Sequence, residues 1–161
     1  YRGKGALRRA RAMVREGWRH APHPDLSAAW LDLADDTSPA RQYQQLEALV
    51  GDRETAESHL ALARQAIAAD LPGPARGHLT AALELGPQRR IYQALETLEQ
   101  KLGNDTAARF AATKAASAPR DPAWQCTNCG YRQSLWSELC GSCGSFATLE
   151  WTAVRKEETA L

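Results

Sequence analysis

Four cysteines near the end of the chain constrain its fold more than any other feature. They form two C-x2-C pairs separated by ten residues, and a glycine, Gly130 or Gly144, follows the second cysteine of each pair. Two cysteines three positions apart can aim both sulfurs at one ion from a tight turn, and two such turns supply a tetrahedron of thiolates. Glycine adopts the left-handed conformation of such turns without steric cost. The spacing predicts a structural metal site in which protein fills every coordination position, made by Cys126, Cys129, Cys140 and Cys143.

The ligand type leaves the metal open between zinc and iron. A tetrahedron of thiolates suits Zn²⁺ with Zn–S bonds of about 2.3 Å, so we expect zinc, with iron as the alternative. An iron–sulfur cluster uses the same ligands. Two disulfides would suit a secreted domain, but no signal-peptide pattern opens the chain. A redox-active cysteine pair would need a βαβ context, which the sequence does not provide.

The residues before the cysteines are predicted to be mainly helical. The chain has 30 alanines but only two isoleucines and three valines, a usage that favours helices over a sheet core. Start and stop signals recur at short intervals, such as Ser38-Pro39 at a start and Gly86-Pro87 at a stop. They predict six or seven short helices, over about 6–19, 26–33 (after a cap at Asp25), 39–50, 54–69, 75–85, 90–102 and, after a cap at Asp105, up to 119.

Small and large residues alternate in these helices as in a tetratricopeptide repeat, a helix pair of about 34 residues. If Pro87 ends one unit, Leu62 and Ala63 fall on core positions of its first helix. Ala75, Leu79 and Ala82 then fall on those of its second. Stacked pairs leave a concave groove lined by the first helices. We expect a protein partner to bind there and to contact Glu57, Leu60, Arg64, Tyr92 and Glu96. A helical bundle without repeats is the alternative.

These patterns divide the chain into three segments. We expect tetratricopeptide-like helical repeats over 1–119, a small four-cysteine knuckle of the zinc-ribbon kind over 120–154, and a tail over 155–161. The knuckle should cap the last repeat, which would otherwise leave an apolar face in water. A strand is expected within 146–154, and a miniature core should form from Trp124, Trp136, Phe146 and Trp151.

Charge and motif content argue against several functions. The chain has 20 basic and 19 acidic residues. This balance provides no overall positive potential that would favour binding to nucleic acid. Seven of the basic residues lie between Arg2 and Arg19. This strip suits contact with anionic lipid headgroups or RNA, or is simply the solvated face of a helix. No phosphate loop, nucleophile elbow, HExxH or paired-carboxylate motif is present, so we expect no enzyme. The histidines are scattered and receive no metal role: His20, His23, His59 and His78.

Three stretches near the end of the chain carry a family resemblance. They are the approach to the cysteines (Ala118-Pro119-Arg120-Asp121-Pro122-Ala123-Trp124-Gln125-Cys126), the second Cys-x2-Cys-Gly and the Leu149-Glu150-Trp151 ending. Together they resemble the C-terminal part of the bacterial HemY family. The plan is also similar to that of the LapB family, which joins tetratricopeptide repeats to a rubredoxin-like knuckle. The resemblance implies a scaffold or adaptor associated with haem biosynthesis. It also implies a membrane anchor upstream of Tyr1 and a soluble part on the cytoplasmic face of the inner membrane.

Two departures from these families bear on the metal and the function. Gly141 follows Cys140 where such knuckles often have proline, which costs rigidity but not ligation. The Trp-x-Cys frame also resembles the Ran-binding type of zinc finger, some members of which bind RNA, but that family expects an asparagine near Gln133. An RNA-binding module and a haem- or porphyrin-handling role are therefore carried as alternatives to the scaffold.

Overall fold

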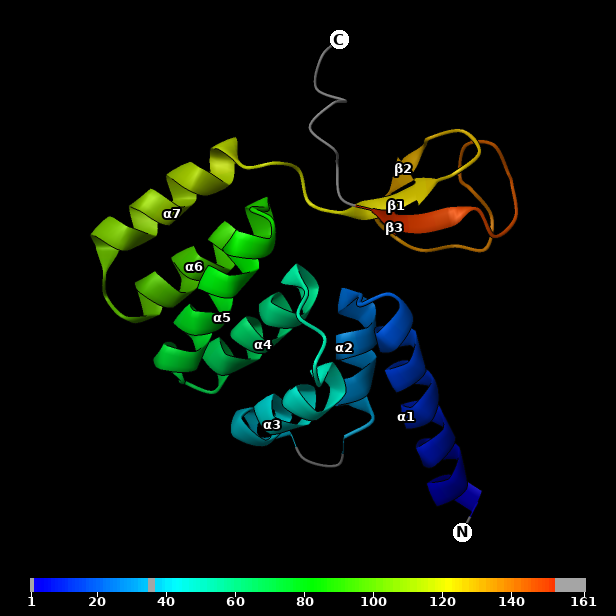
Figure 1. The fold of residues 1–161 in the computed structure, drawn as a ribbon, viewed down its shortest axis with the longest axis horizontal. Coiled ribbons are helices and arrows are strands. Elements are labelled where there is room, and N and C mark those ends of the chain that lie inside the picture. The colour runs from blue at the N-terminus through cyan, green and yellow to red at the C-terminus, as the bar shows by residue number, and fades with distance from the viewer. Residues whose placement is uncertain (1, 35–36, 153–161) are drawn as a thin grey trace. The chain divides into compact units, whose positions relative to one another are not determined.

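The chain forms two compact units that divide after Ser117. The computed structural model describes residues 2–34 and 37–152 (Figure 1). Each unit has its own buried cluster, and each is described by itself. The predicted capping of the repeats by the knuckle remains a prediction, and the predicted tail over 155–161 lies outside the described residues.

The described part of the first unit is helical, which confirms the mainly α class. Its helices are α1 (Arg2–His20), α2 (Pro24–Asp32), α3 (Pro39–Val50), α4 (Ala56–Ala68), α5 (Pro72–Leu85), α6 (Arg89–Lys101) and α7 (Asp105–Ser117). Helix α5 begins at Pro72, three residues before the predicted start, because proline is well tolerated in the first turn of a helix. Helix α1 begins four residues before its predicted start.

Side chains cap the three helix starts for which a cap was predicted, in two cases from a different residue. Ser38 accepts from the N–H of Arg41 at the start of α3, as predicted. At α2 the cap is His23, whose Nδ1 accepts from the N–H of Asp25, so the predicted cap Asp25 lies within the first turn instead. At α7 the side chain of Asn104 accepts from the N–H of Ala107, one residue before the predicted cap.

The helices pack as successive neighbours. Helix α4 lies against α5 along its length, and α6 lies against α7 in the same way (Figure 1). Helix α4 also contacts α2 and α6, so these three form a continuous face. Small residues bring the helices together, since axis separation depends on side-chain size. Ala63, Ala66, Ala75, Ala82 and Ala111 are fully buried.

The second unit contains a three-stranded antiparallel sheet. Its strands are β1 (Ala123–Cys126), β2 (Arg132–Gln133) and β3 (Leu149–Thr152), in the order β2-β1-β3. Trp124 on β1 pairs with Trp151 on β3. Their rings pack edge to face, with ring centroids 5.5 Å apart. The predicted core of four aromatics is thus only half formed, because Trp136 is 57% and Phe146 71% exposed. Residues 153 and 154 of the predicted strand lie outside the described range.

Candidate metal centre

The four cysteine sulfurs converge in the second unit. Their ligand atoms all lie within 4.8 Å of one another. Cys126 Sγ is 3.7 Å from Cys143 Sγ, and Cys129 Sγ is 3.6 Å from Cys140 Sγ. Metal–sulfur bonds of about 2.3 Å in a tetrahedron place two sulfurs roughly 3.8 Å apart. A disulfide bond would instead bring two sulfurs to about 2.05 Å. The donor set and its spacing therefore fit a zinc or iron ion held by four thiolates.

Two turns of matching design present these sulfurs. The N–H of Gly130 donates to the carbonyl of Cys126, and the N–H of Gly144 donates to that of Cys140. Gly130 and Gly144 have φ of +75° and +67°, the left-handed conformation expected from the sequence. The N–H of Cys126 also donates to Tyr131, as that of Cys140 does to Ser145. The two C-x2-C-Gly motifs thus fold alike and face each other.

Polar side chains around the sulfurs form a second layer that the sequence pattern did not single out. The hydroxyl of Ser145 lies 3.2 Å from Cys143 Sγ, and that of Thr148 lies 3.2 Å from Cys126 Sγ. Asn128 Nδ2 donates to Cys143 Sγ at 3.6 Å and to Ser145 Oγ at 2.9 Å. Donors of this kind stabilise thiolates and orient metal ligands. The only sequence signal for them is their position within five residues of a cysteine.

The surroundings of the sulfurs shift the pKa values of the cysteines in different directions. The hydroxyl and N–H of Ser145 lower the pKa of Cys143 to about 5, and the Thr148 hydroxyl lowers the pKa of Cys126. The N–H of Tyr131 lowers the pKa of Cys129, but burial and the neighbouring sulfurs outweigh it and raise that pKa to about 11. A divalent ion must therefore displace at least one proton to bind all four sulfurs, so binding weakens in acid.

Gly141, the departure from the usual proline, has a role that proline cannot fill. Its N–H donates to Gln133 Oε1 at 3.2 Å. Gln133 Nε2 in turn donates to the carbonyl of Leu135 and to Ser137 Oγ. Proline has no N–H and would leave this amide oxygen without that donor. Glycine here connects the second cysteine turn to the loop that precedes it.

The predicted groove residues fall into three environments in the first unit. Leu60 is wholly buried, so it belongs to the core. Glu57 is 7% exposed and Arg64 is exposed, and both line a depression of about 360 Å³ between α2 and α4. Tyr92 and Glu96 are half-buried on α6. Neither lines this depression or a second one, between α4 and α6.

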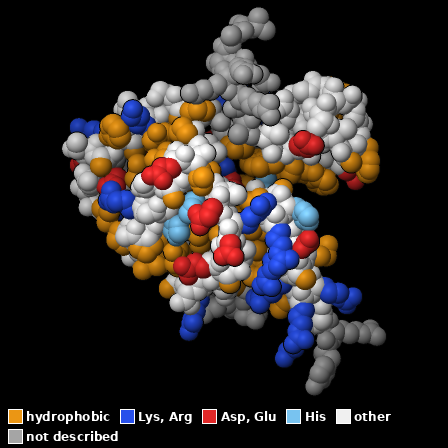
Figure 2. Space-filling model, in the orientation of Figure 1, with side chains coloured by type: hydrophobic (Ala, Val, Ile, Leu, Met, Phe, Trp, Pro, Cys, Tyr) orange, Lys and Arg blue, Asp and Glu red, His pale blue; other side chains and the backbone are white. Residues whose placement is uncertain are grey.

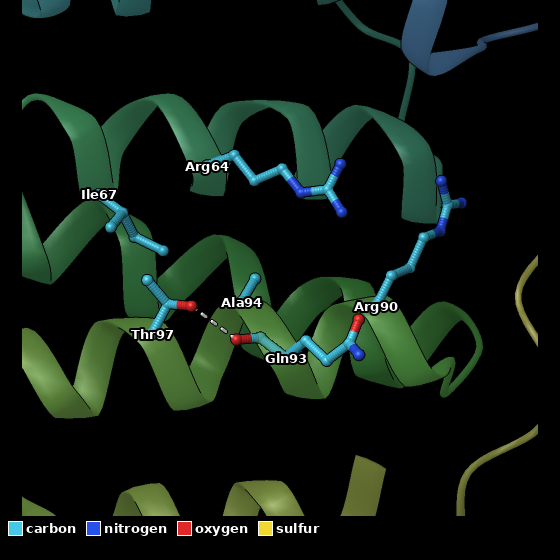
Figure 3. A pocket seen from close by; sticks show the side chains of 6 residues that line it. All are labelled: Arg64, Ile67, Arg90, Gln93, Ala94 and Thr97. Atoms are coloured by element: carbon cyan, nitrogen blue, oxygen red, sulfur yellow. Dashed lines mark hydrogen bonds between the residues drawn. The ribbon is translucent and has the colours of Figure 1, made fainter. Parts of the chain in front are cut away.

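A second depression of about 210 Å³ lies between α4 and α6 (Figure 3). Arg64 and Ile67 of α4 face it from one side, and Arg90, Gln93, Ala94 and Thr97 of α6 face it from the other. On α6 the lining positions 90, 93, 94 and 97 follow the i, i+3, i+4, i+7 pattern of one helix face, and the predicted positions 92 and 96 lie beside that face. Helices α2, α4 and α6 thus line the two depressions, and the predicted contacts of Tyr92 and Glu96 with a partner remain a prediction.

A buried ion pair lies at the edge of this face. Arg90 Nη2 is 2.5 Å from Glu57 Oε2, and both side chains are at most 10% exposed. Burial raises the pKa of Glu57, although Arg90 and Arg64 act in the opposite direction. The pair links α4 to α6, and Arg64, which lines both depressions, adds positive charge beside it.

The basic strip of α1 gathers at one end of the first unit (Figure 2). Arg11 and Arg15 place their guanidinium groups 5.8 and 5.2 Å from the ring centre of Trp30 on α2. Arg11 also donates to the carbonyl of Leu33. These two arginines hold α1 against α2 by cation–π contacts. Arg15 is nevertheless exposed, as are Lys4, Arg8, Arg9 and Arg19.

Comparisons with known proteins give a distant relative but no family. No family model matches the chain. A protein described as "Probable magnetosome protein Mms48", from Magnetospirillum gryphiswaldense, is 30% identical over 161 residues, which are 98% of this chain and 36% of that protein. The chain thus spans about a third of the relative's length. Among the described helices, none combines the length and the apolar character needed to cross a membrane.

Proposed function

We propose that this chain is a non-enzymatic interaction scaffold, whose helices bind a protein partner and whose knuckle is held by one structural metal ion. The observation that carries the proposal is the hollowed face of α2, α4 and α6, where Arg64 lines two neighbouring depressions. Helices packed in successive pairs, with contacts between the first helices of neighbouring pairs, suit a tetratricopeptide-like array. The rubredoxin-like character of the knuckle and its zinc, with iron as the alternative, belong to the same proposal.

The lining of the α4–α6 depression indicates the chemistry of the partner. Arg64 and Arg90 bring two guanidinium groups to the lining, close to the carboxylate of Glu57. Ile67 and Ala94 add apolar surface, while Gln93 and Thr97 add polar groups. We propose an extended peptide segment that combines an acidic side chain with small apolar ones. Its backbone could use the amide of Gln93 for hydrogen bonds.

The cellular setting is also part of the proposal. We propose that the whole protein is a membrane-anchored, HemY- or LapB-like adaptor with this part on the cytoplasmic face. The four-cysteine cluster and its approach support that reading. The relative's name connects that protein with magnetosomes, and for this chain we propose only the scaffold role that such an architecture serves.

Isotope-labelled protein tests the groove directly. We would titrate the zinc-loaded chain with a pool of extended acidic peptides and follow backbone amide NMR signals. Shifts should concentrate at Arg64, Gln93 and Thr97, and Arg64→Glu should remove them. Arg109→Glu, at an exposed position of α7 outside both depressions, is the matched control and should bind as the parent does. Shifts elsewhere, or binding that survives Arg64→Glu, would overturn the groove assignment.

Exposed aromatics favour one second candidate, a single-stranded RNA-binding knuckle. Tyr131, Trp136 and Phe146 are 47%, 57% and 71% exposed, and exposed rings can stack on bases. Labelled single-stranded RNA, titrated at 20 and 200 mM salt, should then bind with a steep salt dependence, and Trp136→Ala should weaken binding at both salt concentrations. Absence of binding at the lower salt would remove this candidate.

A further inference from the structure

A chain of hydrogen bonds links side chains of the first unit, away from both the knuckle and the groove. Glu54 precedes α4, His59 lies on α4, His78 on α5 and Tyr43 on α3. Glu54 Oε2 is 2.7 Å from His59 Nε2, and Tyr43 Oη is 3.1 Å from His78 Nε2. The Nδ1 atoms of the two rings are 3.1 Å apart, in direct hydrogen-bond contact. Tyr43 also hydrogen-bonds to Glu47, one turn further along α3. Each end of the chain is therefore a carboxylate.

The number of protons in this chain decides how many of its links can form. The four links are Glu54–His59, His59–His78, His78–Tyr43 and Tyr43–Glu47, and each needs one proton between its two atoms. A neutral imidazole supplies one N–H, and the tyrosine supplies one O–H. With both rings neutral, three protons therefore serve four links. One link is then left with two acceptors facing each other.

One additional proton completes the chain. His59 then donates from Nε2 to Glu54 and from Nδ1 to His78 Nδ1. His78 donates from Nε2 to the Tyr43 oxygen, and the Tyr43 hydroxyl donates to Glu47. The positive charge of the ring pair is now flanked by a carboxylate at each end. Every link holds one proton, so this is the best satisfied state of the chain.

A second additional proton cannot be accommodated in the same way. Both Nδ1 atoms would then carry hydrogen across a gap of 3.1 Å, where neither could accept, and two positive rings would face each other. The link between His59 and His78 must break. The geometry thus predicts that the pair takes up one proton and resists the next.

We propose that this chain is a pH-sensitive latch, which ties α3, α4 and α5 together while its two histidines share one additional proton and opens when a second proton binds. The groups that face His78 are Tyr43 and Glu47 from α3, His59 from α4 and Glu54 from the residues before α4. Burial, followed by the charge of His59, lowers the pKa of His78, while Glu47 and Glu54 act in the opposite direction. Both rings are half-buried, so protons from the solvent can reach them.

The ring NMR signals of the histidines in the full chain, followed from pH 8.5 to 4.5, test the latch. The signals of His59 and His78 should both change in each of two steps, with midpoints about one pH unit or more apart, because coupled groups titrate as a pair. The backbone amide signals of the two residues should shift with the lower step, when the link between α4 and α5 breaks. His20, an exposed histidine that contacts Glu16 on α1, is the internal control and should titrate in a single step. Single, independent steps at His59 and His78 would overturn the proposal.

Two substitutions separate the latch from an ordinary pair of neighbouring histidines. His78→Gln leaves a single ring, so His59 should titrate in one step, provided that circular dichroism shows the variant to be folded. Tyr43→Phe removes two links from the charged chain but only one from the neutral chain. It should therefore weaken binding of the first proton by roughly two- to tenfold, the worth of one hydrogen bond. His20→Gln should leave both steps unchanged. Two steps retained at His59 in His78→Gln, or an unchanged upper midpoint in Tyr43→Phe, would contradict the latch.

Discussion

Gly130 and Gly144 show how single residues set the geometry of the metal centre. Both have positive φ, and beyond the adjacent residues no heavy atom lies within 4 Å of where a Cβ would stand at either. Substitution there is therefore a test of backbone conformation alone, without a steric clash. Gly141 differs, since its φ is not in the left-handed range and a Cβ would make ordinary contact with Gln133 at 3.4 Å.

Gly130→Ala should weaken metal retention, because a non-glycine residue in the left-handed conformation costs about 1–2 kcal/mol. That cost corresponds to a shift of roughly five- to thirtyfold in the chelator concentration that removes the metal. Gly141→Ala keeps the backbone N–H of residue 141 and should change the chelator concentration needed to remove the metal only slightly. Equal effects of the two substitutions in a chelator competition would contradict the role of the left-handed turn.

His23 couples helix capping to pH. It is 7% exposed and caps α2 through Nδ1, which accepts a hydrogen bond only when it carries no proton. Burial is the main cause that lowers the pKa of His23 in the folded chain. The unfolded chain, with an ordinary pKa of about 6.5, therefore takes up the proton first as the pH falls.

The free energy of unfolding should accordingly drop as the pH is lowered from 7.5 to 5.5. Asparagine is also a good cap and does not titrate, so His23→Asn should lose less stability over the same range. Urea unfolding of both proteins at the two pH values measures the difference. The pKa of His78 is also lowered, but His78 is present in both proteins. Its contribution to the pH dependence of stability therefore cancels when the two proteins are compared. The prediction fails if the two proteins lose equal stability.

At the scale of elements, ion pairs that involve a buried carboxylate connect different helices. Arg90 and Glu57 join α6 to α4. Glu99, which is 1% exposed, pairs with Arg76 of α5 and accepts from Asn104, the cap of α7. Such pairs need not add much net stability, but removing one partner leaves a buried charge that is costly. They favour one relative placement of the helices over its alternatives.

Arg90→Leu should therefore destabilise the first unit by about 3–5 kcal/mol at pH 7.5. Arg89→Leu, at the adjacent exposed position, should change stability by less than about 0.5 kcal/mol. Lowering the pH should partly rescue Arg90→Leu, since burial raises the pKa of Glu57 and the unpaired carboxyl can then take up a proton. Denaturant unfolding at pH 7.5 and 5.5 tests both the magnitude and the rescue.

At the scale of the whole molecule, the two units depend on different sources of stability. The first has a core of many buried residues from α1 to α6. In the second, the buried cluster is Cys126, Cys140 and Leu149, with Trp124 packed against it, so two of its three buried members belong to the candidate metal centre. A core of that size needs a metal or disulfide to hold a fold. Metal binding and folding should therefore be linked in the second unit alone.

Removal of the metal, by a chelator or by Cys140→Ser, should unfold residues 118–152 and leave the helices of 2–117 intact. Amide NMR signals from the knuckle should collapse to unfolded positions, whereas the circular dichroism at 222 nm should fall only slightly. Restoring zinc to the chelated wild type should recover the signals. Global loss of helix, or a knuckle that stays folded without metal, would contradict this division.

The sequence alone determined the features that depend on local chemistry. Helix ends were predicted where serine, proline or glycine fixes the backbone of its own neighbours, and the cysteine turns were predicted because both ligands of a pair lie three positions apart. The same locality explains the small errors, such as the cap that moved from Asp25 to His23. Capping needs only a nearby acceptor, and more than one residue offered it.

Only the tertiary structure decided which distant side chains meet. On α6 the depression beside α4 is lined by Arg90, Gln93, Ala94 and Thr97, a set that the pattern of the sequence did not single out. The approach of His59 to His78 follows from how α4 lies on α5, and Trp136, in the loop that follows β2, remains 57% exposed. These contacts depend on helix rotation and packing, where a change of one residue turns a side chain by about 100°.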